Sequence, residues 1–195
     1  MSESALERGG EAAADSRAAA DSRARSGESG VAALVGDIPA HWKPQPTSRM
    51  CFVCGRENPV GLHIQFYEDH EKQQIVVPLV LPDHYQGYPG IAHGGILATI
   101  LDEATGRALM MAMEDDPFWV TAKLEMRYRK PTPTETPLTV VGWVVKQRSR
   151  TAEVAGEIRL ADGTVTVEAS ALIVCPHEET LKDWEQEQQF WRVQS

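Results

Sequence analysis

One segment limits what this chain can fold into more than any other. Residues 94–113, GGILATILDEATGRALMMAM, have the length and composition of a helix. A helix on a protein surface carries a single apolar stripe, with polar residues elsewhere. Here the apolar residues cover nearly the whole circumference; they are Ile96, Leu97, Ile100, Leu101, Ala104, Ala108, Leu109, Met110, Met111 and Met113. The pattern predicts an enclosed helix, around which other elements must wrap.

Strand patterns on both sides of this helix provide the wrapping elements. Residues 120–128 alternate strictly between apolar and polar, which predicts a strand with one buried face. Further strands are predicted at residues 62–67, 74–81, 138–146, 151–160 and 164–174, and Asp162-Gly163 predicts a tight hairpin turn. Two strands, one enclosed helix and four more strands predict an α+β fold, in which a curved antiparallel sheet wraps around a central α-helix.

The two ends of the chain differ from this predicted domain at residues 62–175. Residues 1–40 are rich in Ala, Ser, Gly, Arg and Glu, and repeat AAADSR at 12–17 and 18–23, so they bury too little apolar surface to fold. They are a disordered extension, or the true start lies downstream, near Met50. Residues 41–61 form a leader with a Cys-x-x-Cys sequence. Residues 176–195 carry an acidic amphipathic helix.

Composition excludes several classes of partner. The chain has 195 residues, a net charge of −9 and a pI near 5.1, which argues against binding to nucleic acid or to an anionic membrane. No apolar run approaches the roughly 20 residues that span a bilayer. Three cysteines are too few for a disulfide scaffold, so a reducing cytoplasm is expected. The expected partner is a small molecule.

Asp102 is the first candidate for chemistry, because an unpaired carboxylate inside an enclosed helix is costly to desolvate. Its neighbours one turn away are small, which leaves space for a second helix or a ligand; they are Ala98, Thr99, Thr105 and Gly106. A purely structural role, with a hydrogen bond to Thr99 or Thr105, is the alternative. The adjacent Glu103 has Arg107 four residues later as an ion-pair partner and is therefore the weaker candidate.

The start of the same helix offers a second polar feature. Gly94 and Gly95 expose backbone N–H groups at the positive end of the helix dipole, where a carbonyl or oxyanion can dock. The alternative is a simple turn, anchored by His93. Asp102 lies seven residues after Gly95, or about 10 Å along the axis, too far to attack a carbonyl bound there. A second copy of the helix, packed antiparallel, could bring its own Asp102 closer.

Two motifs in these segments carry a family resemblance. Residues 90–103, GIAHGGILATILDE, resemble the hotdog-fold acyl-CoA thioesterases of the PaaI and THEM type. The pattern Thr-x-x-Leu-x-x-x-Tyr-x-x-Pro from Thr121 to Pro131 is similar to the strand that follows the helix in that family. The resemblance covers roughly residues 50–175 and implies a hotdog fold over residues 62–175.

The resemblance also implies a mechanism. Gly94 and Gly95 would polarise the thioester carbonyl, and His93 would shape the loop. Asp102 of the facing subunit would act as the nucleophile or as the base that activates water, with Thr121 beside it. The expected assembly is a homodimer or a tetramer, and neither a metal nor an organic cofactor is implied, because coenzyme A is part of the substrate.

The sequence departs from the family, or from its own pattern, at two positions. Many relatives have Asn or Gln six residues before the His to orient the attack, whereas this chain has Gly87 there, with Gln86 alongside. Strict alternation also places Thr121 on the solvent face of its strand. A β-bulge, or a position at the sheet edge, would bring the Thr121 side chain back to the site.

The charge pattern suggests where the phosphates of coenzyme A bind. Residues 120–150 hold seven basic residues against two acidic ones, although basic side chains on strands also serve solubility and edge protection. The candidates for coenzyme A binding, together with Gly87, are Arg127, Arg129, Lys130, Arg148 and Arg150. The candidates that set the depth of the acyl pocket are Met110, Met111, Met113, Phe118 and Trp119.

Two alternatives stay open at this point. Cys51 and Cys54 have the spacing of half a zinc site, but no second pair has matching spacing, so a packed turn is predicted and no metal. The domain could also bind acyl-CoA without hydrolysing it, as a sensing module. A dehydratase on the same fold is a weaker alternative.

Overall fold

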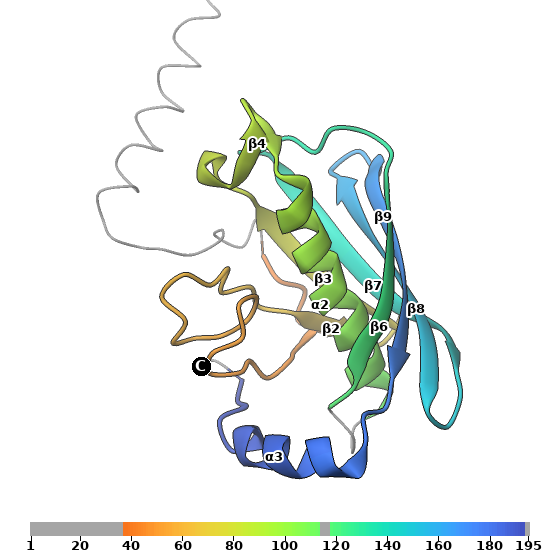
Figure 1. Ribbon diagram of the computed structural model, residues 1–195. Coiled ribbons are helices and arrows are strands. Elements are labelled where there is room, and N and C mark those ends of the chain that lie inside the picture. Colours follow the sequence, from red (N-terminus) through yellow and green to blue (C-terminus); the bar gives the residue numbers. More distant parts are fainter. Residues whose placement is uncertain (1–36, 114–117, 194–195) are drawn as a thin grey trace, which may run out of the picture. The chain divides into compact units, whose positions relative to one another are not determined.

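The structure is a computed structural model, and it describes residues 37–113 and 118–193 (Figure 1). The predicted disorder of residues 1–40 therefore falls almost entirely outside the described residues. Within them, no helix combines the length and the apolar character needed to cross a membrane.

Seven antiparallel strands form the main sheet, in the order β1-β2-β3-β7-β8-β9-β6. The strands are β1 (Lys43–Pro44), β2 (Tyr67–Asp69), β3 (Gln74–Val80), β6 (Val120–Tyr128), β7 (Pro137–Gln147), β8 (Thr151–Leu160) and β9 (Val165–Val174). The helix α2 (Gly94–Ala112) packs across one face of the sheet, and α3 (Glu178–Gln188) follows β9 (Figure 1). The predicted architecture, a sheet wrapped around a central helix, is confirmed.

The core lies between α2 and the inner face of the sheet. Apolar side chains of α2, among them Leu97, Ile100 and Leu101, are almost fully buried against strands β3, β7, β8 and β9. At Gly142 of β7 the helix and sheet backbones approach so closely that a Cβ atom would lie 2.7 Å from the Ala104 carbonyl oxygen. This contact fixes the middle of α2, and therefore Asp102, against the sheet.

One stripe of α2 is not covered. Its residues are only half-buried and recur about once per turn; they are Ala98, Thr99, Asp102, Gly106 and Met110. The prediction of an almost completely enclosed helix is therefore wrong along this stripe within a single chain. The stripe carries the small residues and the acid that the sequence places together.

The strand predicted at residues 62–67 is mostly wrong. Leu62 and Ile64 donate their backbone N–H groups to the carbonyls of Phe52 and Val53 in the leader, and the sheet strand β2 begins only at Tyr67. His63 has a φ of 54°, which interrupts the extended backbone. The apolar residues 62–66 are buried as their pattern suggests, but they anchor the leader.

The loop at residues 82–92 contains structure that its composition does not predict. A short 3₁₀ turn (Asp83–Tyr85) leads into the small hairpin of β4 (Gln86–Tyr88) and β5 (Ile91–Ala92). The N–H of His93 then donates to the Tyr85 carbonyl. These bonds set the direction in which the chain enters α2.

Strand β6 forms an edge of the sheet, and its pairing with β9 shifts between Thr121 and Lys123. The Thr121 side chain is exposed, as the alternation predicts, and it nevertheless lines the cavity beside α2. The predicted burial of alternate residues is correct for Leu124 and Met126, which are half-buried, but wrong for Ala122 and Tyr128, which are exposed. In the described part of the chain no strand pairs with the outer edge of β6, and the apolar face of the strand is only partly covered.

Candidate functional site

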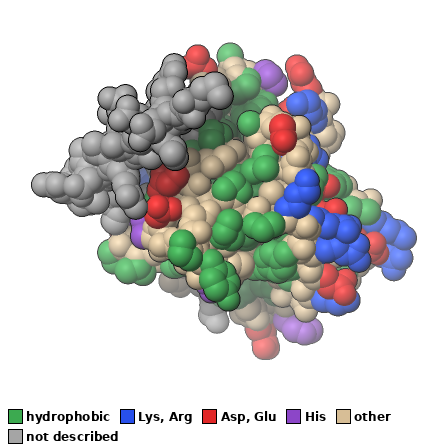
Figure 2. All heavy atoms as spheres, turned by 90° about the horizontal axis from the view of Figure 1, so that it is seen from above, with side chains coloured by type: hydrophobic (Ala, Val, Ile, Leu, Met, Phe, Trp, Pro, Cys, Tyr) green, Lys and Arg blue, Asp and Glu red, His purple; other side chains and the backbone are tan. Residues whose placement is uncertain are grey.

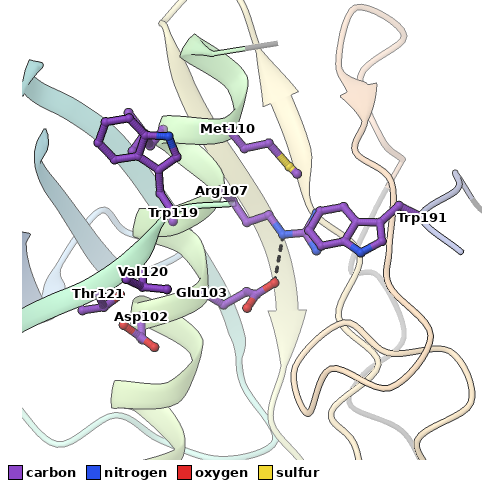
Figure 3. Close-up of a pocket in the computed structure, with 10 residues that line it drawn as sticks. Asp102, Glu103, Arg107, Met110, Trp119, Val120, Thr121 and Trp191 are labelled. Atoms are coloured by element: carbon purple, nitrogen blue, oxygen red, sulfur yellow. Dashed lines mark hydrogen bonds and ion pairs between the residues drawn. The ribbon is translucent and has the colours of Figure 1, made fainter. Parts of the chain in front are cut away.

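A cavity of about 410 Å³ lies beside the uncovered stripe of α2. Side chains from α2, from the start of β6 and from the C-terminal segment line it; they are Asp102, Glu103, Gly106, Arg107, Leu109, Met110, Trp119, Val120, Thr121 and Trp191. In Figure 3, Asp102, Glu103 and Thr121 lie toward one end, and Met110 and Trp119 toward the other. The cavity therefore has a polar end and an apolar end.

Asp102 has the environment of a reactive group. Its Oδ1 atom is buried and has no hydrogen-bond partner among the described residues. The two threonines that could have held it donate elsewhere: Thr105 to the Asp102 backbone carbonyl at 2.8 Å, and Thr99 to the Gly95 carbonyl at 2.9 Å. Neither threonine therefore makes the hydrogen bond to the Asp102 carboxylate that a purely structural role would require.

The adjacent acid behaves differently. Glu103 accepts a hydrogen bond from Arg107 Nε at 2.9 Å, and the Arg107 side chain is only 3% exposed. Burial is the largest single influence and would lower the pKa of Arg107, but the charge and hydrogen bond of Glu103, together with the negative charges of Cys54 and Cys51, raise the pKa overall. The predicted ion pair is confirmed. The charge of Glu103 is thus compensated within the chain, unlike that of Asp102.

At the start of α2, the backbone donors are not equivalent. The His93 ring caps the helix, because its Nδ1 accepts from the Gly95 N–H at 3.0 Å. The N–H groups of Ile96 and Leu97 donate to the His93 carbonyl. The Gly94 N–H has no acceptor among the described residues. A carbonyl that docks here therefore finds the Gly94 donor available and the Gly95 donor engaged by His93.

Tyr128 and Gly87 complete the surroundings of the helix start. The Tyr128 hydroxyl, at the end of β6, donates to the Gly94 carbonyl at 2.8 Å. Gly87 lies against His93, since a Cβ atom at Gly87 would lie 3.3 Å from His93 Cα. Gln86, the residue beside the missing helper position, accepts from the Gly90 N–H at 3.1 Å. Gly87 thus packs against His93, the capping residue, and Gln86 stabilises the loop.

The basic residues predicted to bind coenzyme A form two separate groups. Arg127, Arg129 and Lys130 are exposed at the end of β6 near Gly94, where Arg129 pairs with Glu168 at 2.8 Å. Arg148 and Arg150 are exposed in the β7–β8 turn. This turn lies next to the end of β9, and that end of β9 pairs with the start of β6 at Val120. Eight residues of strand separate the two groups, or about 26 Å. Figure 2 shows basic side chains gathered along one side of the face in view.

Some lining residues were not predicted as part of the site. Met110 and Trp119 were candidates for pocket depth and do line the cavity, whereas the sequence placed Trp191 only within the predicted acidic C-terminal helix. Trp191 lies across Arg107 from Trp119 (Figure 3), with the guanidinium 5.3 Å from its ring centre. Phe118 packs edge-on against Trp191 and Trp184. A cluster of aromatic residues after the last strand is the only sequence signal for this wall.

Comparisons with known proteins point to the same region of the chain. The sequence model of the thioesterase superfamily matches residues 89–167. The chain is 35% identical over 92 residues to the acyl-coenzyme A thioesterase THEM4 of Mus musculus, a match that covers 47% of this chain and 38% of the relative. The THEM4 of Rattus norvegicus is 29% identical over 124 residues, covering 63% and 52%. The chain spans about half, or less, of the length of these curated relatives.

Solved structures agree with the fold. A crystal structure of a thioesterase superfamily protein superposes with a TM-score of 0.60 and 29% identity, over 87% of this chain and 81% of that one. This likeness, together with the family match, confirms the predicted hotdog fold.

Proposed function

Residues 89–167 belong to the thioesterase superfamily, and from this premise we propose that the chain hydrolyses acyl-CoA thioesters to a free acid and coenzyme A. One observation carries the proposal further than the family match. The Asp102 carboxylate has a buried oxygen without a partner, and it lines a cavity large enough for an acyl group, beside the Thr121 hydroxyl. A carboxylate kept in that state is suited to take a proton or to attack a carbonyl carbon.

The proposed reaction needs one donor and one base. The Gly94 N–H, at the positive end of α2, polarises the thioester carbonyl and holds the negative charge that develops on its oxygen. As a base, Asp102 takes a proton from water while the water oxygen bonds to the carbonyl carbon; as a nucleophile, its oxygen bonds to that carbon, and water afterwards hydrolyses the resulting anhydride to the free acid and Asp102. The C–S bond then breaks, and the departing thiolate of coenzyme A is protonated. Thr121 orients the water or the carboxylate. No metal or organic cofactor is needed.

The two groups must come from different subunits. Within one chain, Asp102 lies two helical turns from the Gly94 donor. The uncovered stripe of α2 has small residues around Asp102, and at Gly106 a Cβ atom would meet no other atom within 4 Å. A second copy of α2 can therefore approach closely along this stripe. Its antiparallel arrangement would place each Asp102 nearer the neighbouring helix start, and the proposed assembly is a homodimer or a dimer of dimers.

Hydrolysis of a panel of acyl-CoA thioesters, followed by the release of free thiol, tests this function directly. We expect turnover with at least one acyl class, whose apolar part fits among Met110, Trp119 and Trp191. Binding of the same thioesters without thiol release would instead identify the chain as an acyl-CoA-binding module, and the hydrolase proposal would be withdrawn.

The Gly94 N–H, which would donate to the thioester carbonyl, can be removed without disturbing the helix. Gly94 is the first residue of α2 after the cap His93, and proline is favoured at that position because its missing N–H is not needed there. His93 has an extended backbone, with ψ of 131°, as a residue before proline requires. We expect Gly94→Pro to lower kcat about 10²-fold, since a single oxyanion donor contributes about that much.

Gly94→Ala is the matched control for that variant. It keeps the N–H, and its Cβ atom would make ordinary contact with the Tyr128 ring at 3.4 Å. Its kcat is expected to stay within about threefold of the parent, because no oxyanion donor is lost. Equal losses in the two variants would mean that the glycine is needed for space and not for its N–H.

The phosphates of coenzyme A are assigned first to the basic residues near the helix start. Arg129 is already paired with Glu168, so Arg127 and Lys130 are the better candidates. We expect the double variant Arg127→Gln/Lys130→Gln to raise KM for acyl-CoA about tenfold, through lost charge-assisted bonds. The thioester of the same acid with pantetheine, which lacks those phosphates, is the control substrate. A similar rise in KM for both substrates would contradict the assignment.

A further inference from the structure

The leader brings a second cluster of reactive groups against α2 at Glu103 and Arg107, two residues that also line the cavity. The Cys51 and Cys54 sulfurs and a carboxylate oxygen of Glu103 all lie within 4.8 Å of one another. Arg107 Nη2 donates to the Cys54 sulfur at 2.8 Å, while its Nε donates to Glu103. Neither cysteine has a part in the proposed hydrolysis, so their clustering with a buried ion pair calls for a separate explanation.

The turn that carries the two cysteines is tightly constrained. The Val53 N–H donates to the Cys51 sulfur at 3.3 Å, and the Gly55 N–H donates to the Cys51 carbonyl at 2.8 Å. A Cβ atom at Gly55 would lie 2.3 Å from that carbonyl oxygen, so only glycine fits. Cys51 is half-buried and accessible in part, whereas Cys54 is only 1% exposed. The fold thus holds one accessible and one buried sulfur next to each other.

The surrounding charges make the two thiols unequal. The pKa of Cys54 is lowered to about 7, first by a hydrogen bond from the Cys51 thiol and then by the positive charge of Arg107, against burial and the Glu103 charge, which raise it. A hydrogen bond from the Ser48 backbone also lowers the pKa of Cys54. The pKa of Cys51 is raised by its bond to Cys54, by burial and by Glu103. Cys54 is therefore the more readily deprotonated of the two thiols.

The same donors could instead be read as a metal site, but the contacts do not favour that. Structural zinc sites take four ligands, and here only three donors converge. Two of those three already bond to the Arg107 guanidinium, which supplies the buried positive charge that a metal ion would supply. A thiolate held by arginine and facing a second thiol is instead the arrangement of an oxidisable dithiol.

We propose that Cys51 and Cys54 are an oxidative modification site, which a peroxide converts to an intramolecular disulfide. The Cys54 thiolate attacks one peroxide oxygen; an S–O bond forms, the O–O bond breaks, and the departing hydroxide takes up a proton as water. The Cys51 sulfur then attacks the sulfenic acid of Cys54, forming the S–S bond and releasing a second water with the proton that Cys51 loses. Two thiols are oxidised and one hydrogen peroxide is reduced to two waters.

The test uses the full chain with Cys175→Ser, which leaves only the pair. After treatment with hydrogen peroxide, we expect the loss of both free thiols, an intact mass lower by two hydrogens, and full recovery with dithiothreitol. The added variant Cys51→Ser should stop at a sulfenic acid, which dimedone traps, and Cys54→Ser should react at least about tenfold more slowly, because the thiolate is the nucleophile.

Three results would overturn the proposal. The first is that Cys51 and Cys54 stay reduced at a peroxide concentration that oxidises Cys175 of the parent chain. Another is zinc bound at one ion per chain in protein purified without chelators, which would make the cluster a metal centre. The third concerns pH: alkylation of the pair by iodoacetamide should accelerate as the pH rises through about 7, and a midpoint near the ordinary thiol value of about 8.5 would contradict the activated thiolate.

Discussion

An Asp102→Asn variant is expected to lose at least about 10³-fold in kcat for acyl-CoA hydrolysis, the scale of removing a general base or nucleophile. The substitution keeps the size and shape of the side chain, so the cavity and the packing of α2 are retained. Asparagine can neither accept the proton from water nor form an acyl intermediate. Binding of the thioester should change little, because the carboxylate acts on the reacting atoms and not on the rest of the substrate.

Glu125→Gln is the matched control for this prediction. Glu125 lies on the same strand as Thr121, its side chain is 64% exposed, and it pairs with Lys123 at the surface. Removing its charge should leave kcat unchanged. Both variants should be measured by thiol release under saturating acyl-CoA, with the affinity for coenzyme A measured by calorimetry. An Asp102→Asn protein with more than a tenth of the parent turnover would exclude Asp102 from the chemistry.

A labelling experiment separates the two roles open to Asp102. In single turnover with H₂¹⁸O, a nucleophilic carboxylate forms an anhydride with the acyl group, and water can then return ¹⁸O to the Asp102 side chain. A carboxylate that acts as a base leaves all the label in the free acid. Mass analysis of the peptide that contains residue 102 shows whether ¹⁸O has entered the Asp102 side chain.

The central helix was predictable because local patterns specify it completely. The Gly94-Gly95 pair marks its start, and most of the large apolar residues that follow are buried against the sheet. The structure starts α2 at Gly94 and ends it at Ala112. Strands β6, β7, β8 and β9 also lie within a residue or so of their predicted bounds, since alternation and the Asp162-Gly163 turn are local signals. Gly163 has the φ of 82° that such a turn requires.

Other features depend on contacts that no local pattern encodes. The leader pairs with residues 62–66, and this pairing takes those residues out of the sheet even though their alternation resembles a strand. The capping of the Gly95 N–H by His93 depends on a side-chain rotamer, so the sequence could not distinguish the two glycine donors. Trp191 is held near the cavity by contacts between segments distant in the sequence, among them the backbone pairing of Thr47 with Arg192.

Asp102 shows how far sequence reasoning reaches at the site itself. Its position among small residues predicted a space beside it, and the cavity occupies that space. The sequence left open whether Thr99 or Thr105 held the carboxylate. In the structure both hydroxyls donate to backbone carbonyls instead. Neither a single chain nor its sequence contains the partner helix, on which the proposed site depends.

A heterodimer of two inactive chains is expected to recover activity. In the proposed dimer each site takes the N–H that polarises the thioester carbonyl from Gly94 of one chain, and its carboxylate from Asp102 of the other. A chain with Asp102→Asn still supplies an intact Gly94, and a chain with Gly94→Pro still supplies an intact Asp102. One of the two sites in their heterodimer is therefore complete, and the expected kcat per dimer is about half that of the parent, given two-fold symmetry.

The measurement uses the two variants coexpressed with different affinity tags and purified through both, so that only mixed assemblies are assayed. A doubly tagged Asp102→Asn dimer, purified in the same way, is the control and should stay inactive. If donor and acid instead belonged to the same chain, each chain of the heterodimer would lack one of them, and no complete site would form. Recovery of about half the parent activity, as opposed to no recovery, thus decides whether the site is shared between subunits, because about 12 Å along α2 separates the two groups in each chain.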